Sequence, residues 1–173
     1  MQNDEKLEVW LRGPLPGVPA LLQPAAHALL QALEELSVLE TKFHNQFLWE
    51  RPASVASVGF HLQHLTGVLD RLFTYARKES LNDLQLQYLK NEGSEPFASC
   101  TYGHLLNNFK IQVDKAIDQI LETDESTLTE IRYVGRARIP STHLGLIFHA
   151  AEHTQRHVGQ LLVTARILLS GIE

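Results

Sequence analysis

Most of the chain consists of long stretches in which apolar residues recur every three or four positions. This spacing places the apolar side chains on one face of an α-helix, so it predicts helices rather than strands. We expect four long helices, at about residues 23–43, 54–78, 102–123 and 141–170. A shorter helix is expected over about 81–91, with Ser80 as its N-cap, and Gly171 is expected to end the last helix.

Two segments depart from the helical pattern. Residues 1–21 hold Pro14, Gly17 and Pro19 close together, which indicates an extended lead-in with a short turn near residues 7–11. Residues 127–139 contain several strand formers around Gly135, which favours a loop or short hairpin ended by Pro140. The predicted fold class is therefore all-α: a single four-helix bundle domain over 1–173, with a short non-helical insertion before the last helix.

Composition narrows the class of protein. Hydrophobic residues make up 44% and charged residues 20%, which is typical of a soluble globular domain. The net charge of −5 and the absence of a long basic run argue against a nucleic-acid surface. No apolar run approaches the roughly 20 residues that span a bilayer, and the charged N-terminus does not resemble a signal peptide. With a single cysteine, Cys100, the cytoplasm is the expected compartment, and a homodimer is plausible for a bundle of this size.

A stripe of histidines on the last helix is the main chemical signal. His149, His153 and His157 recur at intervals of four beside the apolar face, so they point toward a seam between helices, where bundles build metal sites. His149 and His157 lie about 12 Å apart along the helix axis at 1.5 Å per residue, too far to share one ion. The chelating pair is therefore His149 with His153, or His153 with His157.

A third ligand must come from another helix, because one helix face cannot surround an ion. The candidates are His61 and His64, on the second predicted helix. Three imidazoles suit several divalent metals and leave a coordination position open for water or substrate. The simpler alternative is a hydrogen-bonded polar seam without metal. His104 and His143 lie near helix starts and are expected to be structural or to stand behind the ligands, and not to bind the metal themselves.

Two segments together resemble the DinB-like superfamily over about residues 23–170. The first runs from Ser57 to Leu65, and the second is the His153/His157 pair before Gly159 and Gln160. The resemblance implies a four-helix bundle whose metal ligands are His64, His153 and His157, with His61 and His149 as neighbours of the ligands. One departure is that many members carry arginine between the second histidine of the pair and the glycine, where this chain has Val158.

The resemblance also implies a kind of chemistry. Members of the family include transferases that use low-molecular-weight thiols, thiol-dependent maleylpyruvate isomerases, iron-dependent sulfoxide synthases and metal-dependent hydrolases. It therefore suggests a divalent metal, zinc or nickel first and iron second, that activates a thiol or water for S-transfer or hydrolysis of a small-molecule substrate. The alternative is a non-catalytic helical stress or interaction protein with a structural or empty metal site.

The site's surroundings are predicted from position alone. His61, His149, Gln160, Arg71 and Tyr75 are expected in the cavity or behind the ligands. Phe60, Tyr102 and Thr164 are further lining candidates. Arg71, or the loop that carries Arg136 and Arg138, is expected to bind an anionic group of the substrate. No residue is assigned as catalytic, since Glu152 falls on the polar side of its helix and no other general base stands out.

Overall fold

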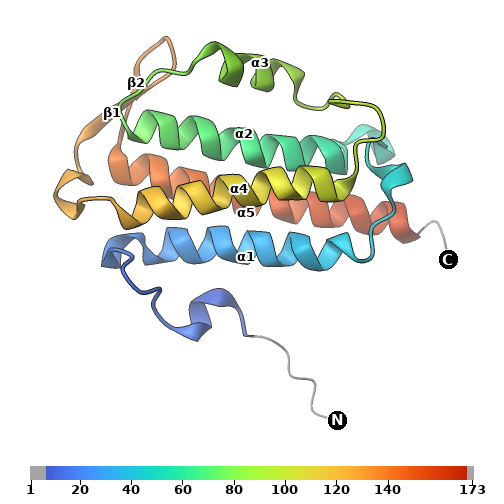
Figure 1. Ribbon diagram of the computed structural model, residues 1–173, viewed down its shortest axis with the longest axis horizontal. Coiled ribbons are helices and arrows are strands. Elements are labelled where there is room, and N and C mark those ends of the chain that lie inside the picture. Colours follow the sequence, from blue (N-terminus) through green and yellow to red (C-terminus); the bar gives the residue numbers. More distant parts are fainter. Residues whose placement is uncertain (1–6, 171–173) are drawn as a thin grey trace.

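Four long helices run side by side and form the body of the protein (Figure 1). The computed structural model describes residues 7–170. The four helices are α1 (Gln23–Glu40), α2 (Val58–Ala76), α4 (Tyr102–Leu121) and α5 (His143–Ser170). Helix α1 packs against α4 and α5, and α2 packs against the same two helices. The contact between α2 and α5 positions the candidate site described below. The predicted all-α four-helix bundle is confirmed, whereas the expected stop at Gly171 lies outside the described residues.

The core is formed by the apolar stripes that predicted the helices. Aliphatic and aromatic side chains from all four long helices meet at the bundle axis and are fully shielded from solvent. They include Leu29, Leu36, Leu62, Leu65, Leu69, Phe109, Val113, Ile120 and Leu161. Burial of these side chains is the main favourable term that holds the helices together.

Side-chain caps determine where α2 and α3 begin. Ser57 Oγ accepts a hydrogen bond from Phe60 N at 3.1 Å, so α2 starts at Val58 rather than near residue 54 as expected, and Val55 lies outside the helix and is exposed. Asn82 forms a capping box at the start of α3 (Asp83–Asn91). The prediction of Ser80 as the cap of α3 was therefore wrong by two positions.

A short β-hairpin connects α4 to α5. Strands β1 (Ile131–Val134) and β2 (Ile139–Thr142) pair antiparallel, with Tyr133 opposite Pro140. Pro140 thus lies within β2 and does not end the insertion as predicted. Proline is tolerated here because each strand of a two-stranded sheet has a free edge.

The remaining segments cover the outside of the bundle. The lead-in contains a short 3-10 turn, Val9–Arg12, close to the predicted turn, and Val9 N donates to Gln31 Oε1 of α1 at 2.9 Å. Helix α3 lies on the outer side of α2 (Figure 1). Among the described helices, none has both the length and the apolarity needed to cross a membrane.

Candidate metal centre

Three histidines from two neighbouring helices converge at the interface of α2 and α5. His64 comes from α2, and His153 and His157 lie one turn apart on α5. One ring nitrogen from each histidine lies within 4.8 Å of the other two, and His64 Nε2 is 3.0 Å from His153 Nε2. Nitrogens so close together, with no carboxylate or amide between them, have the arrangement of ligands around one ion.

A buried carboxylate orients His64. His64 Nδ1 donates to Glu92 Oε2 at 2.6 Å, and Glu92 Oε1 accepts from Arg71 Nη1 at 2.7 Å. The Glu92 side chain is only 5% exposed. Because Nδ1 is occupied, His64 presents Nε2 to the other two histidines. Histidines that bind metals commonly donate their second nitrogen to such a carboxylate, which fixes the tautomer and the ring orientation.

Helix α2 also holds Glu92 in place. Gly93 N donates to Gln63 Oε1 at 2.7 Å, and Gln63 Nε2 donates to Ser94 O at 2.9 Å, so the chain on the C-terminal side of Glu92 is tied to the helix. A methyl group at Gly67 would overlap both Glu92 Oε1 and Arg71 Nη1. Gly67 therefore makes room for the ion pair within α2.

Glu92 was missed by the sequence analysis, which had expected Arg71 to bind substrate. Arg71 is instead engaged by Glu92, with its side chain 11% exposed, and so does not reach into open space. A glycine three residues after His64, in the middle of an apolar helix, was the available signal that another chain segment approaches there.

A contact with the imidazole of His61 orients His157. His61 Nδ1 lies 3.0 Å from His157 Nδ1, and His61 itself is 3% exposed. Nδ1 of His157 is thus occupied, which leaves its Nε2 as the nitrogen available for a metal. His61 therefore stands behind a ligand, in the position that the family resemblance implied.

Burial keeps these imidazoles neutral. Desolvation, with a smaller contribution from His64, lowers the pKa of His61 and of His157 to about 4, and burial also lowers the pKa of His153. In addition, His153 Nδ1 is buried without a hydrogen-bond partner among the described residues. Neutral imidazoles with free lone pairs are the form that binds a divalent metal, so the donor set fits such an ion.

His149 lies beside the cluster and not in it. Its side chain is 49% exposed and Nδ1 contacts Glu152 Oε1 at 2.6 Å, while the other carboxylate oxygen of Glu152 accepts from Arg156 at 2.8 Å. His149, Glu152 and His153 form a second group of potential ligands. That group is on a single helix and its carboxylate is shared with Arg156, so the three-histidine group is the better candidate.

A groove of about 560 Å³ opens next to the cluster, between the start of α2 and the C-terminal half of α5. Its walls are mostly apolar, and they also include three residues expected around the site: His61, Gln160 and Thr164. Phe60, another expected residue, stacks on the ring of His64 at a centroid distance of 5.3 Å. The volume and the lining suit a small molecule.

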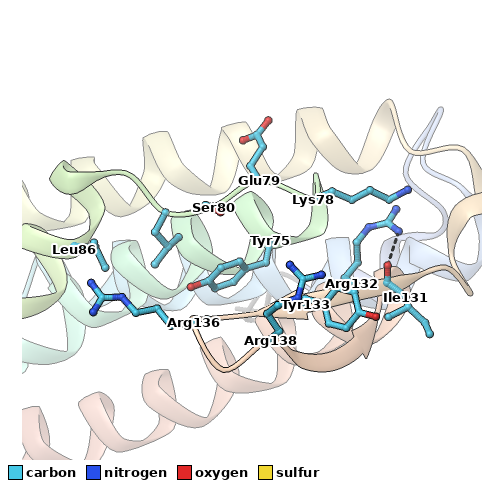
Figure 2. A pocket seen from close by; sticks show the side chains of 12 residues that line it. Tyr75, Lys78, Glu79, Ser80, Leu86, Ile131, Arg132, Tyr133, Arg136 and Arg138 are labelled. Carbon is cyan, nitrogen blue, oxygen red and sulfur yellow. Dashed lines mark hydrogen bonds between the residues drawn. The ribbon is translucent and has the colours of Figure 1, made fainter.

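Other residues expected in this cavity lie elsewhere. Tyr102 is buried in the core and donates its hydroxyl to Leu36 O. Tyr75, Arg136 and Arg138 line a different cavity, beside the hairpin (Figure 2). Tyr75 and Tyr102 therefore do not line the groove beside the metal ligands.

Fold and site together define an all-α bundle with a three-histidine cluster between two of its helices. The family model of the DinB superfamily matches residues 21–161, a range that includes all three histidines. The chain therefore belongs to the DinB superfamily. No curated protein matches the chain.

Proposed function

We propose that this protein is a metal-dependent enzyme in which His64, His153 and His157 hold one divalent ion that activates a thiol or a water molecule. The observation that carries the proposal is the convergence of three imidazoles, one of them oriented by the buried Glu92. Zinc or nickel is the first expectation and iron the second, since three imidazoles suit all of them. A bound ion of this kind would lower the pKa of a thiol or water and polarise an electrophile.

The protein's own residues have separable roles in this proposal. Glu92 and His61 hold His64 and His157 so that both present Nε2 to the ion. The apolar groove would bind the body of a small-molecule substrate, and Gln160, at its edge, offers an amide for hydrogen bonding. The reaction would then be a thiol S-transfer, with a low-molecular-weight thiol as co-substrate, or a hydrolysis.

Compartment and assembly complete the proposal. The one cysteine, Cys100, is buried, so the fold needs no disulfide and suits a reducing cytoplasm. Helix α5 exposes Phe148, and an exposed large apolar side chain of this kind would support a homodimer. Light scattering on the purified protein measures the assembly directly.

The first experiment is metal analysis of protein purified without an affinity tag. We expect about one equivalent of a divalent metal in the native protein and in His149→Ala, and loss of that metal in His153→Ala with an unchanged circular dichroism spectrum. The matched histidine variants lie one turn apart on α5, so a general effect on the helix would appear in both. A native protein that binds no divalent metal when it is offered would contradict the proposal.

The second experiment separates enzyme from non-catalytic protein. The metal-loaded protein is screened for conjugation of small thiols to electrophiles and for hydrolysis of ester and amide substrates, with His153→Ala as the blank. Activity that requires both metal and His153 supports the enzyme. Metal binding without activity in either screen would favour the alternative, a helical interaction protein with a structural metal site.

A further inference from the structure

A second cavity, of about 520 Å³, lies between the β-hairpin and the chain that leads from α2 into α3 (Figure 2). It is well separated from the histidine cluster. Tyr75, in its wall, follows His64 by 11 residues on α2, which corresponds to about 16 Å along the helix. A small ligand in this cavity would therefore not reach the metal centre, and its binding does not depend on the function proposed above.

The cavity carries uncompensated positive charge in an acidic protein. Arg136 and Arg138 both line it, and neither forms an ion pair with a carboxylate of the described residues. The chain as a whole has a net charge of −5. Two guanidinium groups without a carboxylate partner line the same cavity, and such a lining suits an anion.

The nearby carboxylates are already neutralised. Glu130 accepts from Lys78 at 2.8 Å and from Arg132 at 3.0 Å, and Glu79 is held by Arg77 at 2.8 Å. In Figure 2 the Glu79 side chain points away from Arg136 and Arg138. Neither carboxylate is therefore available to the two arginines.

The hairpin loop holds Arg138 in a defined arrangement. Arg138 N donates to Gly135 O at 3.1 Å, and Arg138 itself has a positive φ of 49°. Its guanidinium lies 4.3 Å from the ring centre of Tyr133. A left-handed backbone conformation is unfavourable for arginine, and such strain is often retained where a side chain must be aimed at a ligand.

Aromatic and aliphatic side chains form the other walls. Figure 2 shows the ring of Tyr75 in the cavity, with Arg136 on one side and Arg138 on the other. Leu81 and Leu86 add apolar surface. Guanidinium groups beside a flat apolar wall match an organic molecule that joins an oxyanion to an aromatic or aliphatic body.

We propose that this cavity binds a small organic oxyanion, a carboxylate or a phosphate monoester, through Arg136 and Arg138, with its apolar part against Tyr75. The test is calorimetric titration of the full-length protein with phenyl phosphate, benzoate and the uncharged benzyl alcohol. The first two probes distinguish phosphate from carboxylate. We expect saturable binding of at least one of them and none of benzyl alcohol.

The variants locate the site. The double variant R136Q/R138Q should weaken binding by about tenfold or more, because each charged hydrogen bond contributes substantially to affinity. Arg166→Gln, which removes an equally exposed arginine from α5, should change it less than about twofold. His153→Ala should leave it unchanged. Both hairpin arginines are exposed, so their replacement should not affect folding.

Three results would overturn the proposal. The first is that neither anion binds. The second is binding that survives R136Q/R138Q but is lost in His153→Ala, which would place the anion at the metal centre. The third is that a short RNA oligonucleotide binds through the two arginines while the small anions do not, which would make the cavity part of a polyanion surface.

Discussion

The same three side-chain types, arginine, glutamate and histidine, form two partly buried clusters along α2, one at its middle and one at its C-terminal end, but they meet in a different order. At the middle of α2 the carboxylate of Glu92 stands between Arg71 and His64. Near its end, Arg132 Nη2 contacts His143 Nδ1 directly at 3.3 Å, and Glu130 lies on the far side of the arginine, 44% exposed.

The order of contact gives the two histidines different properties. His64 donates Nδ1–H to a buried anion and turns its Nε2 toward two further imidazoles. His143 lies beside a cation, and burial together with Arg132 lowers its pKa. No other histidine is grouped with it as a potential ligand within the described residues. A buried histidine is therefore a candidate ligand when its environment orients a lone pair toward other ligands, and burial alone does not suffice.

The largest expected effect tests this difference directly. His64→Ala should abolish stoichiometric metal binding, whereas His143→Ala should keep the metal. The latter should lower the free energy of unfolding by about 1–3 kcal/mol, since it leaves buried partners unsatisfied. Metal content by mass spectrometry and urea denaturation measure the two effects. Equal metal loss in both variants would show that the His64 and His143 clusters do not differ in metal binding.

Removing the negative charge of each cluster should give a smaller contrast. In Glu92→Gln the side chain no longer stabilises the oriented His64, so metal affinity should fall by about 10- to 100-fold. Glu130→Gln in the other cluster should leave the affinity unchanged. Competition with a chelating indicator measures both. An unchanged affinity in Glu92→Gln would mean that the carboxylate serves only to pair with Arg71.

The difference between the clusters also explains what the sequence could predict. The helices follow from apolar periodicity, which is a local property. The spacing of His149, His153 and His157 limited the ligand pair to two choices, and the family resemblance selected between them. Glu92 contacts His64 because α3 packs against α2. The two residues are 28 positions apart in the sequence, so no local periodicity predicts their contact.

The placement of the arginines failed for a related reason. Either Arg71 or the loop that carries Arg136 and Arg138 was expected to bind an anionic group of the substrate, because a planar guanidinium matches a carboxylate. Whether an arginine is unpartnered depends on the fold: Arg71 is paired with Glu92, while the hairpin arginines lie at a separate cavity. The charge of each arginine follows from its residue type, whereas its contacts depend on the fold.

Substitution of two helical glycines tests whether the Glu92–Arg71 ion pair supports metal binding. In Gly67→Ala the new methyl group would displace Glu92 and Arg71, so metal affinity should fall severalfold. In Gly159→Ala the methyl group meets nothing within 4 Å, so only the helix propensity changes and stability should rise by up to about 1 kcal/mol. Indicator competition and urea denaturation measure both variants. A Gly67→Ala protein with native metal affinity would show that the ion pair can shift without disturbing His64.

The smallest expected effect concerns the pH dependence of the other cluster. Burial and Arg132 lower the pKa of His143 in the folded protein, so the unfolded chain takes up its proton first. This residue's contribution to stability is therefore complete above the unfolded pKa of about 6.5 and is lost as the pH falls from there toward the folded pKa.

In His143→Gln this part of the acid destabilisation should disappear, and the free energy of unfolding should decrease less between pH 7 and pH 5.5 than in the native protein. Urea denaturation at both pH values, in the presence of a chelator so that metal binding does not contribute, measures the difference. Identical pH dependence in the two proteins would mean that His143 takes up its proton as easily in the folded protein as in the unfolded chain, and that neither burial nor Arg132 lowers its pKa.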